Sequence, residues 1–508
     1  MTRPQIAPDQ PNRRAIILPG GGMRVAYQAG AIQALHEAGL RFSHADGTSG
    51  GLMNLAALLS GVEPADLARR WRTLRPTSFI SPLSIRGYLA FPNLPALGDF
   101  DGLVTRVFPH LGIDVAKIRK AEGVSAYFNV CDFAEKVVKA IPGNEIEEPL
   151  LLAGLSLPLF TPAVQHGDTT WTDAVWIQDS NILKAVRNGA NELWVLWCIG
   201  NTPRLKTGFL NQYVHMIEMS AIGWLNGELA EIVRMNDAIA RGEAPYGHEA
   251  PIIVHVVKPE RPLPLDPDYV SGKVSGEALV DHGYMDASHY LAGKAAGGVS
   301  LDASATRMIE PAGGVSFRET MSGRISFGAD DPETGHRDDS AIPTVLSATI
   351  NIRDVVAFVR GEDHRADMAA HLYSPRLGFT LPATSSNFQL FCPTDDPELT
   401  EMVYEIGFRR DGRHYWFSGR KAVRKGPFWR LWRDTTTLFV RVHEGHDRSG
   451  KVVAAGILKL GAFDFGALLT TLHARDVQGL LPRLRVMTVF AAFFSRELWR
   501  TYGLGRRR

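Results

Sequence analysis

The sequence is poor in cysteine and has almost no excess charge, and each shortage excludes a class of protein. Only three cysteines, Cys131, Cys198 and Cys392, occur in 508 residues. Their wide spacing and odd number argue against a disulfide framework and favour free thiols in a reducing compartment. Basic and acidic residues number 55 and 54, so no global charge attracts nucleic acid, and we expect no nucleic-acid partner.

The chain also lacks a long apolar run. No apolar core of a secretory signal precedes the first expected strand, which begins at Ala15. The longest weakly polar stretch, Pro149–Val164, contains Gly154, Pro158 and Pro162 and is shorter than the ~20 residues that a membrane-spanning helix needs. We therefore expect a soluble, cytoplasmic protein.

The pattern of apolar residues divides the chain into two parts. Up to about residue 260, β-rich runs alternate with helix-like runs, which is typical of a largely parallel sheet covered on both faces. A stretch rich in Ala, Gly and Ser follows, and beyond it apolar and polar residues alternate as in antiparallel strands. We expect an α/β three-layer domain over residues 14–295, a linker over 296–316, an all-β sandwich or barrel over 317–480, and a basic amphipathic helix over 481–508.

The same patterns predict individual elements. In the first part, strands are expected at 15–18, 42–46, 124–131, 193–199 and 252–257, and helices at 26–38, 51–59, 65–71, 102–107, 181–188 and 213–241. In the second part, strands are expected at 317–327, 344–352, 388–391, 403–408, 414–417, 437–442 and 452–460. The Pro- and Gly-rich segment 82–98 is expected to be either a plain loop or a lid.

Two glycine-rich turns close to each other carry the chemistry. Pro19–Gly22 ends the first strand and opens a helix, and Gly47–Gly51 fits G-x-S-x-G, a strand–turn–helix elbow that exposes Ser49. A serine hydroxyl is a poor nucleophile near neutral pH, so Ser49 needs a base and donors for the oxyanion that its attack creates. Candidate donors are the backbone N–H groups of Gly20, Gly21, Gly22 and Met23 and the side chain of Arg24.

These residues resemble the patatin-like phospholipase family. Gly20–Arg24 is similar to the family's G-G-G-x-R-G turn, Gly47–Gly51 matches its G-x-S-x-G elbow, and Trp171-Thr172-Asp173 looks like the approach to its distant D-G-G or D-G-A motif. The resemblance covers roughly residues 14–290. It implies a lipid acyl hydrolase with a Ser–Asp dyad, in which Ser49 attacks an ester carbonyl and Asp173 is the base. It also implies a lipid ester substrate and no metal or organic cofactor.

Some positions depart from the family pattern. Val25 replaces the last glycine of the first motif, Ala174-Val175 follows Asp173 in place of Gly-Gly or Gly-Ala, and His44 and Asp46 interrupt the strand before the elbow. The hydroxyl, the carboxylate and the three leading glycines are all kept. The departures leave a catalytically weak lipid-binding or scaffold protein as the alternative function.

Other interpretations of the glycine turns also stay open. A dinucleotide site is one, because Gly20-x-Gly22 follows a strand and Asp46 lies ~20 residues further on. Against it, Val25 occupies the position of the third glycine or an alanine. A second interpretation makes Ser49 only the N-cap of the next helix.

The base has rivals as well. Asp168 follows a glycine at an expected hairpin tip, and Asp179 resembles a cap of the helix expected at 181–188. A Ser-His-Asp triad would need His255, His282 or His289, and none of these lies in a recognisable catalytic pattern.

The C-terminal helix combines apolar residues with arginines. Leu481–Arg508 contains Arg483, Arg485, Arg496, Arg500 and three terminal arginines against one acid, Glu497. This composition suits a peripheral contact with anionic lipid. Packing of the same apolar residues against the β domain is the alternative.

Overall fold

The computed structural model describes residues 13–89, 93–294 and 296–502. It divides into two compact units, Met1–Glu310 and Pro311–Arg508. Residues 506–508, the terminal arginines noted above, lie outside the described residues, as do residues 90–92 of the segment 82–98. Within the linker expected over 296–316, Ala305 and Met308 are buried in a core of the first unit, and the first strand of the second unit begins at Gly314.

A mixed sheet organises the first unit. Its strand order is β5-β6-β3-β2-β1-β7-β8, with β4 paired to β3. Strands β3, β2, β1, β7 and β8 run parallel, while β4 and β6 pair antiparallel with β3, and β5 pairs antiparallel with β6. The strands are β1 Arg14–Leu18, β2 His44–Thr48, β3 Ser125–Asp132, β4 Val137–Pro142, β5 Val164–His166, β6 Thr169–Asp173, β7 Glu192–Leu196 and β8 Ile253–Val257. The predicted largely parallel sheet is confirmed. Of its antiparallel edge, only the hairpin tip at Asp168 was predicted, because β4–β6 are short and only half buried.

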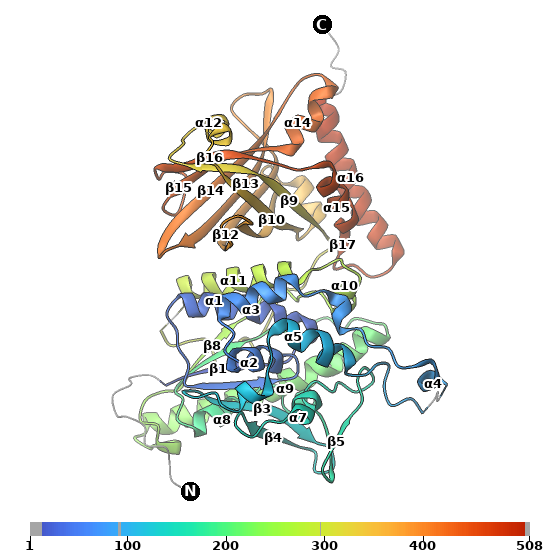
Figure 1. Cartoon of the computed structure of the whole chain (residues 1–508), viewed down its shortest axis with the longest axis vertical. Helices are drawn as coiled ribbons and strands as arrows, with labels where there is room; N and C mark the ends of the chain where they lie inside the picture. Colours follow the sequence, from blue (N-terminus) through green and yellow to red (C-terminus); the bar gives the residue numbers. More distant parts are fainter. Residues whose placement is uncertain (1–12, 90–92, 295, 503–508) are drawn as a thin grey trace. The chain divides into compact units, whose positions relative to one another are not determined.

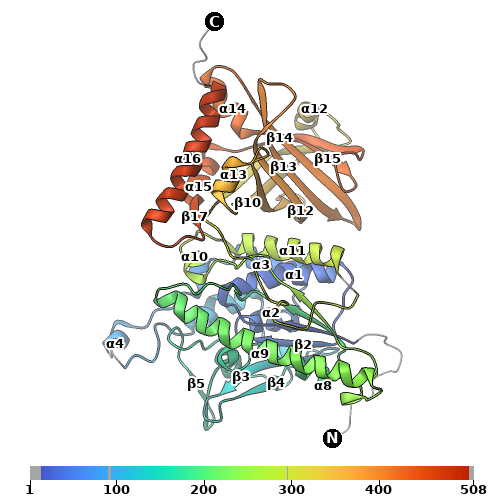
Figure 2. The ribbon, with the colours of Figure 1, turned by 180° about the vertical axis from the view of Figure 1, so that it is seen from behind.

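Helices cover both faces of this sheet, as predicted (Figures 1 and 2). Ile16 and Leu18 of β1 share one core with α1 (Ala26–Glu37), α2 (Gly51–Leu59), α3 (Pro64–Thr73) and α11 (Gly276–Gly293). Ala15 and Ile17 share the opposite core with α8 (Ile182–Arg187) and α9 (Phe209–Ala240). This alternation along β1 is what the pleat of a strand between two helix layers requires. The shorter helices are α4 Ile85–Tyr88, α5 Phe108–Leu111, α6 Val115–Ile118, α7 Glu148–Ala153 and α10 Asp266–Val270.

Helices α1 and α11 approach each other closely through two glycines. A methyl group on Gly30 would lie 1.9 Å from the carbonyl oxygen of Val280, and one on Gly283 would lie 1.8 Å from that of Tyr27. Only glycine lets the two backbones touch at these points. Helix α11 was not predicted, because polar residues and glycines interrupt its apolar pattern.

The second unit is a closed antiparallel barrel. Each strand from β9 to β16 pairs with the next, and β9 also pairs with β16, which closes the circle. Of the two predicted architectures, sandwich or barrel, the barrel is therefore the observed one. Its strands are β9 Gly314–Phe327, β10 Ile342–Ile352, β11 Arg365–Ser374, β12 Phe379–Pro393, β13 Leu399–Arg410, β14 Arg413–Arg424, β15 Thr437–Glu444 and β16 Val452–Lys459, and β17 His473–Arg475 adds to β9 outside the circle.

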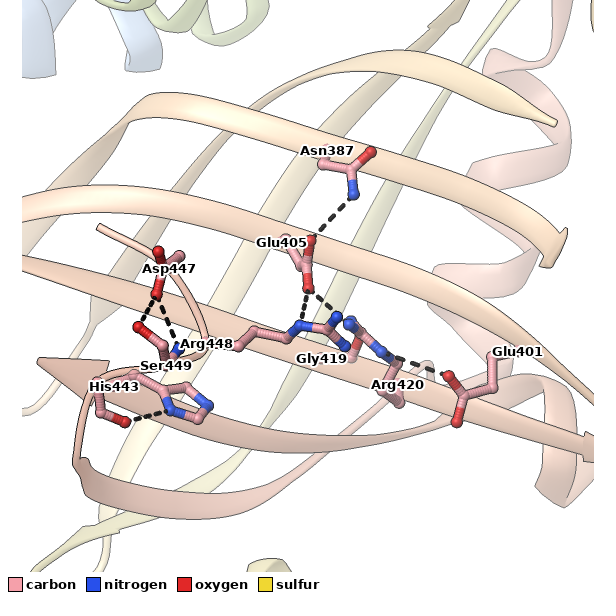
Figure 3. Close-up of polar contacts among 10 residues, drawn as sticks. Asn387, Glu401, Glu405, Gly419, Arg420, His443, Asp447, Arg448 and Ser449 are labelled. Carbon is pink, nitrogen blue, oxygen red and sulfur yellow. Dashed lines mark hydrogen bonds and ion pairs between the residues drawn. The ribbon is translucent and has the colours of Figure 1, made fainter. Parts of the chain in front are cut away.

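A polar network fixes the outer face of the barrel (Figure 3). Tyr404 of β13 belongs to the apolar core, so its neighbour Glu405 points outward. Glu405 accepts hydrogen bonds from Asn387 of β12 at 2.9 Å and from Arg420 of β14 at 2.5 Å. Arg448, from the β15–β16 connection, lies 3.5 Å from the same carboxylate. Three strands and one turn are thereby tied together.

A buried ion pair lies inside the barrel. Lys421 donates to Glu319 at 2.5 Å, and the hydroxyl of Tyr404 donates to the second carboxylate oxygen at 2.7 Å. The side chains of Lys421 and Glu319 are only 2% and 3% exposed. Charges so deeply buried are tolerated because each has its partner.

Helix α16 (Leu480–Tyr502) packs onto this barrel core. Val486, Phe490 and Phe493 are buried in the core, and the ring of Phe490 lies 6.3 Å from that of Phe317 on β9. Much of the apolar face of α16 is thus covered by the barrel. The other helices of this unit are α12 Pro332–Arg337, α13 Val355–Arg360, α14 Leu431–Thr436 and α15 Ala462–Thr471. In the part of the chain that the structure describes, no helix combines the length and hydropathy needed to cross a bilayer.

Candidate active site

The elbow is built where β2 turns into α2. Ser49 has a φ of 51°, a strained value that raises its side chain at the tip of the turn. A methyl group on Gly51 would lie 2.0 Å from the carbonyl oxygen of Leu18, so only glycine lets α2 start this close to the end of β1. The N-cap of α2 is Gly50, with no side-chain cap. The interpretation of Ser49 as an N-cap is therefore wrong.

The first glycine turn lies directly beside the elbow. A methyl group on Gly20 would lie 2.8 Å from Cβ and 3.2 Å from Oγ of Ser49. The N–H of Gly20 donates to Asp179 at 2.9 Å and that of Met23 donates to Asp266 at 3.0 Å. The N–H groups of Gly21 and Gly22 have no hydrogen-bond partner among the described residues. Of the four candidate backbone donors, these two are the ones available to a ligand.

Buried amides hold the turn in place. Gln28 of α1 donates to the carbonyl oxygens of Pro19 at 2.7 Å and Leu196 at 3.1 Å. Asn54 of α2 donates to the side chain of Gln28 at 3.1 Å and to the carbonyl oxygen of Val25 at 2.9 Å. The glycine turn is thus fixed to the elbow helix and to β7 by groups that contact no solvent.

Arg24 lies within this turn and is 7% exposed. Its Nε donates to the carbonyl oxygen of Gly21 at 3.0 Å, and its Nη1 is buried without a partner among the described residues. Its charge lowers the pKa values of Asp179 and Asp266 against the larger effect of burial, which raises both. Arg24 therefore stabilises the turn and balances nearby carboxyl groups.

Strand register brings Asp173 to the same place. Thr48, which precedes Ser49, pairs with Asn129 of β3, and Asp173 at the end of β6 pairs with the next residue, Val130. The hydroxyl of Ser49 lies close enough to the carboxyl of Asp173 to lower its pKa. Residues more than a hundred positions apart in the sequence are thereby brought together.

The carboxyl group of Asp173 is almost fully buried, at 1% exposure. Burial raises the pKa of Asp173 to about 7, against the opposing effects of Ser49 and of the Val175 N–H, which donates to Oδ1 at 2.9 Å. Oδ2 has no hydrogen-bond partner among the described residues. A carboxyl group with this pKa and a free oxygen beside a hydroxyl can accept a proton near neutral pH.

Two further buried acids surround the turn. Asp179 is fully buried, and burial together with the charge of Asp173 raises its pKa to about 8. Its side chain binds Gly20 and does not cap α8, whose N-cap is Asn181, so the interpretation of Asp179 as a helix cap is wrong. Asp266 lies 243 residues from Met23 in the sequence, and no local pattern connects the two.

An apolar cavity of about 650 Å³ opens onto these groups. Ser49, Asp173, Gly21 and Gly22 line it together with mostly apolar side chains, among them Met53, Phe79, Leu157, Phe160, Val175 and Ile217. Segment 82–98 also contributes to the lining, through Pro82, Tyr88 and Leu97. The volume and lining are typical of a site for a small, largely apolar ligand with few polar contacts.

Comparison with known protein families finds a match within the first unit. Residues 16–186 match the sequence model of the patatin-like phospholipase family. The first unit is a patatin-like domain. At the level of the family, this match supports a lipid hydrolase and implies a lipid substrate. The match does not extend into the barrel.

Comparisons with solved structures and with curated protein sequences give no further support for a function. The crystal structure of VipD from Legionella pneumophila is similar at 12% identity and a TM-score of 0.28, over 56% of this chain and 67% of that one. No curated protein sequence gives a significant match.

Most of the departures from the family pattern are accommodated inside the patatin-like domain, although both ring nitrogens of the buried His44 have no hydrogen-bond partner among the described residues. Val25 is fully buried, and its Cγ1 would lie 2.9 Å from a methyl group on Gly50, so it packs between the two glycine turns. Ala174 and Val175 form a short 3-10 turn whose N–H binds Asp173. Asp46 is fully buried and accepts from Asn129 at 2.6 Å. An Asp46 carboxyl buried in this way cannot bind a ribose, which removes the support for a dinucleotide site.

The rival bases do not reach the patatin-like cavity. Asp168 is exposed in the β5–β6 turn, and His255 stacks on Trp194 with ring centroids 4.2 Å apart. Neither these residues nor His282 or His289 belong to the described lining of the cavity. The described residues also contain no cluster of three or more His, Cys, Asp or Glu side chains suited to a metal ion.

Proposed function

We propose that the patatin-like domain hydrolyses lipid esters, with Ser49 as nucleophile and Asp173 as general base. The observation that carries the proposal is the free Oδ2 of Asp173, a buried carboxyl with a pKa of about 7, beside the Ser49 hydroxyl in an apolar cavity. An apolar lining fits the acyl chain of a lipid, and the buried acceptor fits the proton of the serine.

In the proposed reaction, Oγ of Ser49 attacks the ester carbonyl carbon while its proton passes to Asp173. The carbonyl oxygen becomes an oxyanion, for which the N–H groups of Gly21 and Gly22 and the guanidinium of Arg24, all from residues that line the cavity, are the candidate donors. Collapse of this intermediate breaks the ester bond, and the leaving alcohol takes the proton from Asp173. Water then attacks the acyl-enzyme, Asp173 accepts a water proton and returns it to Ser49, and the fatty acid leaves.

The protonation state of Asp179 supports this scheme. With a pKa of about 8, its carboxyl is mostly neutral at pH 7. A neutral group beside the glycine turn does not repel a developing oxyanion, whereas a carboxylate would.

Labelling with a fluorophosphonate tests the proposal, because this reagent forms a covalent bond only with an activated serine. We expect the full chain to be labelled once, and we expect Ser49→Ala to abolish the label. Hydrolysis of a soluble short-chain ester should be lost in the same variant. The alternative, a lipid-binding or scaffold protein without turnover, would give neither label nor hydrolysis while still binding lipid.

We also propose that the chain contacts anionic membranes through α16. The buried face of this helix leaves Leu480, Leu481, Leu484 and Trp499 between 52% and 79% exposed, next to exposed arginines. Replacing Leu480 and Leu481 by Ser should reduce binding to phosphatidylserine vesicles without unfolding the barrel. Unchanged vesicle binding in that variant would contradict the proposal. Truncation of α16 is unsuitable, because it would remove Val486, Phe490 and Phe493 from the core.

A further inference from the structure

The barrel of the second unit contains a cavity that the proposed hydrolase does not use. Its volume is about 370 Å³, within the range of about 300–1,000 Å³ that small-molecule sites occupy. All eight strands of the barrel contribute to its lining, which is mainly apolar and includes Ile325, Leu372, Leu381, Phe408 and Val442. The cavity is therefore part of the barrel lumen.

The lining residues all come from one end of the barrel. They lie near the end of β9, β11, β13 and β15 and near the start of β10, β12, β14 and β16. The opposite end is filled by aromatic rings: Phe317 lies 6.3 Å from Phe490 of α16, and Phe358 of α13 lies 5.6 Å from Phe493. Figure 2 shows α13 beside α16. A ligand would thus enter at the end where β13 turns into β14.

A single arginine lines this cavity. The guanidinium of Arg410 lies 5.2 Å from the ring of Phe379 and 5.7 Å from that of Phe327, so two aromatic rings hold it in position. Its acidic neighbour Asp411 is 3.5 Å away, but the Asp411 side chain is 89% exposed. An exposed pair of this kind is weak, so a ligand anion can compete for Arg410.

Among the described residues that line this cavity, Arg410 is the only cation. Lys421, the interior cation, is bound to Glu319 and is 2% exposed. The anionic end of a ligand must therefore lie at the mouth with Arg410, and its apolar part must lie inward.

We propose that the open end of the barrel binds a fatty acid, with its chain in the lumen and its carboxylate on Arg410. An apolar lumen with a cation at its rim matches an amphiphile that has one anionic end. The proposal does not depend on the hydrolase activity, although a fatty acid is also what such a hydrolase would release.

Photolabelling of the full chain tests this site. A medium-chain fatty acid carrying a diazirine should label peptides within residues 325–454, and an unmodified fatty acid of equal length should compete. The alcohol of the same length should compete at least about tenfold more weakly, because it lacks the charge that a charge-assisted hydrogen bond needs.

Variants separate this site from the cavity of the first unit. Ala454→Phe places a large side chain in the lumen and should abolish the barrel label while labelling of the first unit persists. Arg410→Gln should weaken competition by the fatty acid roughly tenfold. Arg409→Gln is the matched control, because Arg409 points to the other face of β13 and does not line the cavity.

Several results would overturn the proposal. These are labelling confined to the first unit, an unchanged barrel label in an Ala454→Phe variant that melts like the parent chain, or equal competition by acid and alcohol. If Ala454→Phe does not fold, Arg410→Gln alone decides the question. The carboxylate site would be refuted if the unmodified fatty acid competed with the photolabel as strongly in Arg410→Gln as in Arg409→Gln.

Discussion

Changing the pH should switch the proposed active site on and off through Asp173. Burial raises the pKa of this carboxyl from 3.8 to about 7, and only its ionised form can take the proton of Ser49. At pH 5, a group with a pKa of 7 is about 1% ionised, whereas an ordinary aspartate is about 90% ionised. We therefore expect kcat/KM for a soluble ester to fall about a hundredfold between pH 7.5 and pH 5, with a slope of about tenfold per pH unit only below the pKa.

Asp179 should add an alkaline limb to this profile. Its pKa of about 8 means that a negative charge appears beside Gly20 and Ser49 above that pH, where it would oppose the oxyanion. The wild-type profile should thus be bell-shaped, with apparent pKa values near 7 and 8 that belong to the coupled pair. Asp179→Asn keeps an oxygen acceptor for Gly20 but cannot ionise, so this variant should lose the alkaline limb and keep the acid one.

The assay is the initial rate of hydrolysis of a short-chain ester at substrate concentrations well below KM, from pH 5 to pH 9 at constant ionic strength. This rate reports the ionisation of the free enzyme. Far-ultraviolet circular dichroism at each pH controls for unfolding. A rate that stays flat down to pH 5 would refute the reasoning, because it would mean that the base has an ordinary pKa.

Three substitutions test other parts of the account. Asp173→Asn should lower kcat by about 10²- to 10⁴-fold with little change in KM, and an unaltered kcat would exclude Asp173 as the base. Gly22→Ala should lower kcat and the melting temperature, because the φ of Gly22 is +59° and the added methyl group would lie 2.3 Å from Asp266. The control is Gly39→Ala, which has a φ of +84° but no atom within 4 Å of the added methyl group, and it should leave kcat unchanged. Lys421→Met should destabilise the barrel by about 3–5 kcal/mol in urea unfolding, since it leaves the buried Glu319 without a countercharge and with only the Tyr404 hydroxyl as donor. A loss below about 1 kcal/mol would contradict that pairing.

Sequence patterns predicted β1, β2 and α2, which carry the first glycine turn and Ser49, but not β6, which ends in Asp173. The apolar run of β1 is buried on both faces, and Gly51–Leu59 has the predicted bounds of α2, so both gave strong signals. The periodicity of apolar residues was weak in elements that pack against both polar and apolar neighbours. Strand β11 is rich in Ala and polar residues, and α11 buries glycines and an aspartate against other helices, so neither had a clear period.

The long-range contacts of the site could not be read from the sequence. Asp179 and Asp266 bind the first glycine turn across 159 and 243 residues, and no local spacing connects them to it. These two contacts decide which backbone N–H groups stay free. The sequence could therefore predict the backbone N–H groups of Gly20 to Met23 as candidate donors. Only the fold shows that those of Gly21 and Gly22 have no hydrogen-bond partner among the described residues.

The most direct test of the central claim is intact-mass analysis of the full chain after reaction with a fluorophosphonate at pH 7.5. We predict one adduct, located by peptide mapping on Ser49, with a labelling rate that falls at least a hundredfold in Asp173→Asn. An adduct on another residue, or full-rate labelling of Ser49 without the Asp173 carboxyl, would contradict the proposed Ser–Asp pair.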